Sequence, residues 1–218
     1  MNNHEQDPCR SCVDCGRKAC RNSDSARYPD FCLTKNADSG ELEEIREEYL
    51  TSENQDIMQA AAKIQAETYG RLTRVEETIL FAKEMGYKKI GIATCTALLR
   101  ESQMLTRILR TNGFQVFSAC CKVGAIEKCN VNIPKEHITQ GPNICNPIMQ
   151  AKLLNEQHTD LNIVMGLCVG HDMLFHKYIE GPTTTMIVKD RVLAHNPAAA
   201  LYTTHSFYKK ILEPIDLE

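Results

Sequence analysis

The stretch KKIGIATCTALLRESQMLTRILRTNGFQVFSA, residues 88–119, decides the fold. It opens with a short apolar run, continues in a helical pattern over residues 97–113 that ends at Gly113, and closes in a second apolar run. Strand–helix–strand units of this kind build a parallel sheet whose two faces are covered by helices. We therefore predict an α/β domain with Rossmann-like three-layer architecture and a mostly parallel sheet.

The same alternation continues to the end of the chain. Asn146 and Pro147 form an N-cap and first-turn pair, which marks the start of a helix. Further strands are predicted over residues 161–167 and 183–189, and further helices over 146–157, 171–179 and 197–201. The pattern therefore predicts an α/β domain over residues 88–218, although it does not fix the order of the strands.

Two different segments precede this domain. Residues 41–87 predict helices that form a linker region packed on the main domain, with capping boxes at Ser52 and Thr73. Residues 1–40 are rich in cysteine and charged side chains and have few large apolar ones. Such a segment cannot bury a core, so only a bound metal would give it a fixed structure.

The cysteine content indicates metal ligands in preference to disulfides. The chain has 11 cysteines in 218 residues, and an odd number fits a purely disulfide framework poorly. The polar N-terminus has no apolar signal-peptide core, and no stretch approaches the roughly 20 apolar residues of a membrane span. We therefore expect a cytoplasmic protein with reduced thiols. The net charge of -3 favours neither nucleic acid nor an anionic membrane as a partner.

The N-terminal cysteines have the spacing of a metal site. Cys12 and Cys15 form a C-x2-C pair, and Cys20 and Cys32 supply two further thiolates. With Cys9 the run becomes C-x2-C-x2-C-x4-C, which resembles a bacterial ferredoxin motif with a longer last gap. We expect an iron–sulfur cluster, a [4Fe–4S] cluster in particular, or a zinc ion, and Cys9 can replace one of the four ligands.

A second group of cysteines lies at the ends of the predicted strands. Cys95, Cys121 and Cys168 follow three of them, and Cys145 precedes a helix N-terminus, which favours a thiolate. The carboxyl ends of parallel strands share one edge of the sheet, where ligands bind. These four cysteines are therefore predicted to bind a metal, while burial as small apolar side chains is the alternative.

Other polar residues and glycines are predicted at the same edge. Gly166 and Gly170 flank Cys168 and allow the backbone to approach a cofactor closely. The candidate catalytic residues are Lys122, His171, Asp172, Lys189, Asp190, Arg191 and His195. The alternatives are ordinary turn glycines, a solvated charge run, and a His195 that serves the local backbone alone.

A rival hypothesis makes Cys168 a nucleophile. The sequence G-L-C-V-G imitates the G-x-S-x-G elbow, with His195 as base and Asp172 or Asp190 orienting it. This motif is short, and it leaves Cys95, Cys121 and Cys145 without a role.

Several longer motifs resemble those of a known family. TRVEE, IGIATC, CCKVG, CNPIMQA, NIVMGLCVGHD and VKDRVLAHNPAAALY resemble an uncharacterised metal-binding family of anaerobic bacteria and archaea, domain of unknown function 1847, from Cys12 to Tyr202. The resemblance implies metal binding and names no reaction.

From residues and resemblance together we predict an iron–sulfur redox protein, a reductase or electron carrier. Its partner would be a small molecule or a redox partner protein, and a homodimer is compatible with the sequence. A zinc-structured binding or sensor module and a Cys168-dependent hydrolase or transferase are the alternatives.

Overall fold

The computed structural model describes residues 10–215, which form two compact units that divide within a helix, between Gln59 and Ala60. The N-terminal unit is built from short turns and helices. Its elements are the 3-10 helices Cys12–Asp14, Ala19–Asn22 and Ser25–Arg27, α1 (Ser39–Tyr49) and the start of α2 (Ser52–Thr68). Among residues 10–59 only Ala19 is buried, so the described part of this unit has almost no apolar core.

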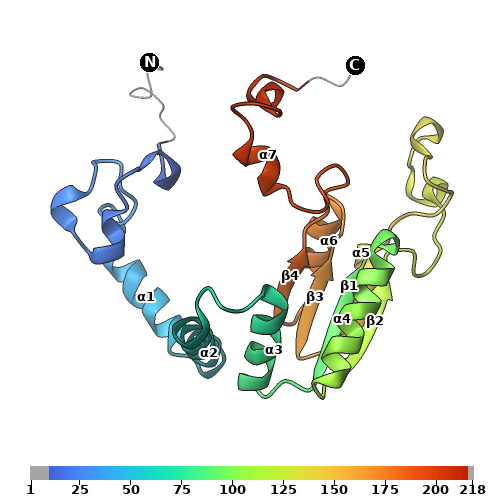
Figure 1. Cartoon of the computed structure of the whole chain (residues 1–218), viewed down its shortest axis with the longest axis horizontal. Helices are drawn as coiled ribbons and strands as arrows, with labels where there is room; N and C mark the ends of the chain where they lie inside the picture. Colours follow the sequence, from blue (N-terminus) through green and yellow to red (C-terminus); the bar gives the residue numbers. More distant parts are fainter. Residues whose placement is uncertain (1–9, 216–218) are drawn as a thin grey trace. The chain divides into compact units, whose positions relative to one another are not determined.

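The C-terminal unit contains a four-stranded sheet in which every strand is parallel to its neighbours (Figure 1). The strands are β1 (Lys89–Thr94), β2 (Gln115–Cys120), β3 (Leu161–Met165) and β4 (Thr183–Ile187). Their order is β2-β1-β3-β4. The predicted α/β class with a parallel sheet is confirmed, and the structure adds the strand order that the sequence pattern did not give.

Helices cover both faces of this sheet and create two apolar cores. On one face, α3 (Arg74–Glu84) and α4 (Leu99–Thr111) pack on the strands through residues such as Ile79 and Leu105. On the other face, α5 (Pro147–Glu156) and α6 (His171–Tyr178) contribute Leu154 and Phe175. The three-layer arrangement follows from strands that are apolar on both faces.

Helix α3 belongs to this core through Ile79 and Ala82. Its N-terminus has the predicted capping box, in which the Thr73 hydroxyl accepts the Glu76 N–H and the Glu76 carboxylate accepts the Thr73 N–H. Arg74 ties the helix to the edge strand, because its Nε donates to the carbonyl oxygen of Thr185 at 2.9 Å.

The segment between β2 and α5 is a long excursion with little regular structure, drawn in yellow in Figure 1. It contains the 3-10 helices Lys128–Val131 and Lys135–His137, and a bridge between Glu127 and Asn143 closes its base. The Asn146 N–H donates to the carbonyl oxygen of Cys121 at 2.7 Å, so the two ends of the excursion meet.

After β4 the chain forms a loop, the short helix α7 (Ala198–Tyr202) and the 3-10 helix Lys209–Leu212. Over residues 10–215, none of the helices is both long enough and apolar enough to cross a membrane.

Candidate functional site

The four predicted N-terminal ligands line one cavity. Cys12, Cys15, Cys20 and Cys32 all contribute to the wall of a cavity of about 410 Å³ within the N-terminal unit. Cys12 and Cys20 are exposed, whereas Cys15 and Cys32 are half-buried. The four cysteines therefore share one cavity, while Cys9 lies outside the described residues.

Local hydrogen bonds hold the segments that carry these thiols. The Asp14 carboxylate accepts the N–H of Ser11 at 2.8 Å and fixes the turn that bears Cys12. The Cys32 N–H donates to the carbonyl oxygen of Pro29 at 3.0 Å. Lys18 and Arg21 also line the cavity and place two cations beside the thiols.

Among residues 10–215, no group of three or more His, Cys, Asp and Glu side chains is gathered as a metal ion requires. Metal binding by these cysteines therefore stays a prediction.

The rim cysteines, Cys95, Cys121, Cys145 and Cys168, follow the strand ends or precede α5, as predicted. The register pairs Thr94 with Cys120, so the next residue of each strand, Cys95 and Cys121, emerges side by side. The two thiols are close enough to shift each other's pKa. The Cys121 sulfur accepts the Thr96 N–H at 3.4 Å and lies 3.9 Å from the Thr96 hydroxyl oxygen.

The pKa values of the two thiols shift in opposite directions. The pKa of Cys95 lies well below its usual range because its sulfur accepts hydrogen bonds from the Cys121 thiol and the Ala97 N–H and faces the Lys189 ammonium. The pKa of Cys121 is raised because its thiol donates to the Cys95 sulfur and because it is buried. At neutral pH Cys95 is therefore the thiolate of the pair.

Lys189 is the most unusual cation of the site. Its side chain is only 9% exposed, and its Nζ has no hydrogen-bond partner of regular geometry among the described residues. It lies on the loop after β4 and acts on the Cys95 sulfur as a neighbouring charge. An isolated buried ammonium is costly, so the thiolate is its natural counterion.

The other rim cysteines also have charged neighbours. The Arg191 guanidinium donates to the Cys168 sulfur at 3.0 Å, and Cys145 is close enough to Cys121 to affect its pKa. Burial and the positive charges of Lys122 and Arg191 lower the pKa of His171. A neutral imidazole at pH 7 follows from this setting.

Several predicted residues instead serve the local backbone. Asp172 accepts the N–H of Met173, and Lys122 donates to the carbonyl oxygen of Asn143. A side chain at Gly166 would collide with Leu98, so this glycine makes room for protein packing, whereas the space beside Gly170 at the start of α6 is open.

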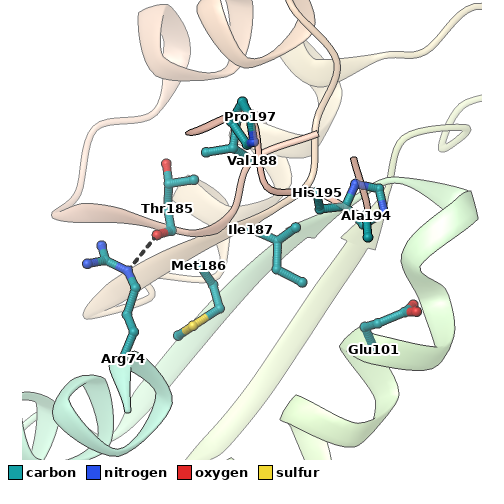
Figure 2. Close-up of a pocket in the computed structure, with 9 residues that line it drawn as sticks. All are labelled: Arg74, Glu101, Thr185, Met186, Ile187, Val188, Ala194, His195 and Pro197. Carbon is teal, nitrogen blue, oxygen red and sulfur yellow. Dashed lines mark hydrogen bonds between the residues drawn. The ribbon is translucent and has the colours of Figure 1, made fainter. Parts of the chain in front are cut away.

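The His195 ring bonds to the loop backbone and lines a pocket. Its Nδ1 accepts the Asp190 N–H at 3.1 Å, and it lines a pocket of about 800 Å³ with Arg74 and Glu101, in which no rim cysteine takes part (Figure 2). The backbone turns at Ala194 and His195, whose φ angles are positive, 50° and 63°.

The residues of the proposed triad form their hydrogen bonds with other partners. The Asp190 carboxylate accepts the N–H groups of Val192 and Leu193, and Cys168 is bonded to Arg191. The structure therefore does not assemble Cys168, His195 and an aspartate as a nucleophile triad.

Comparison with known proteins agrees with the motifs in this site. Residues 32–186 match the family model described as protein of unknown function (DUF1847). The chain belongs to this family. It is also 46% identical over 202 residues to an uncharacterized protein of Methanocaldococcus jannaschii, covering 93% of this chain and 98% of that relative. The DUF1847 match includes Cys32 and all four rim cysteines, and neither comparison assigns a metal or a reaction.

One positioning residue of this DUF1847 member was missed by sequence reasoning. Gln150 is completely buried in α5, and its Nε2 donates to the carbonyl oxygens of Thr94 and Ala119 at 3.1 and 2.7 Å. It thereby ties together the two strand ends that carry Cys95 and Cys121. The signal available in the sequence is a glutamine on the otherwise apolar face of an amphipathic helix, which must find buried partners.

Proposed function

We propose that this protein is a redox protein whose N-terminal unit holds an iron–sulfur cluster on Cys12, Cys15, Cys20 and Cys32. The observation that carries the proposal is the single cavity of about 410 Å³ that all four thiols line. Thiolates are the usual protein ligands of such clusters, which exchange electrons with a redox partner protein or a small molecule.

The composition of the unit supports a bound group. With Ala19 as the only buried residue among residues 10–59, apolar burial contributes little to its stability. Metal–thiolate bonds supply the missing free energy in small domains of this kind. Lys18 and Arg21 at the cavity would also balance the negative charge of a thiolate-bound cluster.

The arrangement of the thiols favours a cluster over a single zinc ion. A tetrahedral zinc ion with Zn–S bonds of about 2.3 Å gathers its sulfurs to about 3.8 Å from one another. In a [4Fe–4S] cluster each thiolate binds a different iron, so the ligands surround a volume, and the cavity of about 410 Å³ that all four cysteines line has room for such a group. A zinc-structured binding module is the second candidate, since the C-x2-C pair suits both.

Anaerobic purification followed by iron, zinc and acid-labile sulfide analysis tests this proposal. A cluster gives iron and sulfide together with brown absorbance near about 400 nm. Cys15→Ser and Cys32→Ser should each remove most of this signal, whereas Cys129→Ser, at an exposed cysteine of the excursion, should leave it unchanged. Stoichiometric zinc in a colourless protein would support the zinc module, and a metal-free protein would contradict both.

Binding of a second metal by the rim cysteines also stays a prediction. The metal content of Cys145→Ala and Cys168→Ala would reveal it as a loss of one equivalent. The contact between Cys95 and Cys121 supports a different role for those two.

A further inference from the structure

Two neighbouring strands end in cysteines whose backbones are held together. The pairing Thr94↔Cys120 is continued by a hydrogen bond from the Cys121 N–H to the carbonyl oxygen of Thr94 at 2.8 Å. Neighbouring strands lie about 4.8 Å apart. That separation is within the roughly 4.4–6.8 Å between Cα atoms that a disulfide bridges.

The two side chains leave the same side of the strand ends, because the residues before them, Thr94 and Cys120, are directly paired. Both thiols are buried there, and each shifts the pKa of the other. Gln150 donates hydrogen bonds to the carbonyl oxygens of Thr94 in β1 and Ala119 in β2 and so holds the two strand ends together. A disulfide between Cys95 and Cys121 would therefore need only a small movement of the side chains.

The third feature is the buried cation beside them. Lys189 is 9% exposed and its Nζ has no regular hydrogen bond among the described residues, so it is available to an anion that forms at this place. Cys95 is 7% exposed and Cys121 only 2%, so a reagent from solvent meets Cys95 first. This exposure admits small oxidants and excludes bulky ones.

We propose that Cys95 and Cys121 form a redox-active dithiol that small hydroperoxides oxidise to an intramolecular disulfide. Cys95 is the residue attacked first, Cys121 resolves the intermediate, and Lys189 is the positioning cation. The proposal does not depend on the N-terminal cluster.

The chemistry balances with the hydroperoxide as the oxidant. The Cys95 thiolate attacks one peroxide oxygen, the O–O bond breaks, and the other oxygen leaves as an alkoxide or hydroxide that takes up a proton from water. Cys95 is then a sulfenic acid. The Cys121 sulfur attacks the Cys95 sulfur, the S–O bond breaks, and the departing hydroxide leaves as water with the Cys121 proton. Each sulfur has given up one electron, and the hydroperoxide has become water or an alcohol and a second water.

A cross-linking experiment on the full chain tests the proposal. The reduced protein is treated anaerobically with one equivalent of hydrogen peroxide, alkylated, digested with trypsin and analysed by mass spectrometry. We expect a disulfide that joins the peptide of residues 90–100 to the peptide of residues 111–122. Because the second peptide also contains Cys120, the link should persist in Cys120→Ser and disappear in Cys121→Ser.

Two further variants separate this chemistry from accidental oxidation. In Cys121→Ser the sulfenic acid at Cys95 should accumulate and be trapped by dimedone added as the protein is unfolded. Lys189→Met should slow formation of the link by at least about tenfold, because the anion that leaves the peroxide then lacks the buried cation beside it. Lys152→Met, an exposed lysine of α5, should not change the rate.

Three results would overturn the proposal. One is free Cys95 and Cys121 after peroxide treatment, and another is a link that forms equally fast in Lys189→Met. The third is a bound metal that protects both thiols from peroxide and from alkylation, which would return them to the role of ligands.

Discussion

The Cys121 thiol and the buried ammonium group of Lys189 both lower the pKa of Cys95, the Cys121 thiol more strongly. Because the pKa of Cys95 is lowered, its thiolate is already fully formed at neutral pH. We predict that the rate at which iodoacetamide alkylates Cys95 changes less than about twofold between pH 6 and pH 8. A thiol of ordinary pKa, about 8.5, loses about tenfold in thiolate for each pH unit below that value. Peptide-resolved mass spectrometry measures the rate.

Cys121→Ala is the matched comparison for this profile. Loss of the Cys121 thiol, the largest cause of the lowered pKa, should raise the pKa of Cys95, so the alkylation rate of the variant should rise with pH over the same range. A wild-type rate that climbs as steeply as that of the variant would show that Cys121 does not stabilise the thiolate.

Gly166 is the second residue with a distinct energetic role. Its φ is +64°, and a Cβ at this position would lie 2.0 Å from Leu98 Cδ1. We predict that Gly166→Ala lowers the free energy of unfolding by about 2–4 kcal/mol, through overpacking and the left-handed backbone. Gly170→Ala, with φ +85° but open space around it, should lose only about 1 kcal/mol. Urea unfolding followed by circular dichroism compares the two, and equal losses would rule out the collision with Leu98.

At the scale of elements, α5 holds the ends of β1 and β2 in place through Gln150. We predict that Gln150→Leu costs about 1–3 kcal/mol, because two buried carbonyl oxygens lose a donor. Lys152→Leu, on the exposed side of the same helix, should change the stability by less than about 0.5 kcal/mol. Chemical denaturation measures both variants, and an unaffected Gln150→Leu protein would show that the strand ends hold without this link.

The elements that could be predicted from the sequence are those with a local signal. Apolar runs predicted all four strands, and the Thr73 and Asn146 caps marked the starts of α3 and α5. The Ser52 cap was wrong, because Ser52 is the first helical residue of α2 and Thr51 accepts the Gln55 N–H. Strand order depends on how crossovers pack on the sheet, so no local pattern contains it.

In the candidate site, too, only the features with a local sequence signal could be predicted. That Cys95 and Cys121 share an edge followed from parallel strands, but their direct contact depends on a register that only pairing determines. Cys145 approaches Cys121 because the ends of the excursion meet, although residues 122–144 have no periodic pattern. His195 was assigned to the rim by analogy with Cys145; the structure shows its bond to the Asp190 N–H and the positive φ angles at Ala194 and His195, which no sequence pattern indicated.

At the scale of the whole molecule, the two units are stabilised in different ways. The C-terminal unit has apolar cores on both faces of its sheet, whereas the described part of the N-terminal unit buries only Ala19. Apolar burial is the main source of folding free energy, so the C-terminal unit should be stable without a bound group. If the N-terminal unit holds a cluster, its order should depend on the metal.

This difference gives a prediction about metal removal. Chelation of the metal should raise the rate of amide hydrogen exchange over residues 10–38 by at least about tenfold, because local opening there then costs less free energy. Exchange in β1, β2, β3 and β4 should remain unchanged, since their cores do not involve the N-terminal cysteines. Mass spectrometry of the full chain with and without chelator measures both regions, and Cys32→Ser should reproduce the effect of chelation without any reagent. Equal protection of residues 10–38 in the two states would show that hydrogen bonds such as those of Ser11 and Cys32 hold the unit on their own. The cavity between the thiols would then have no structural need for a metal.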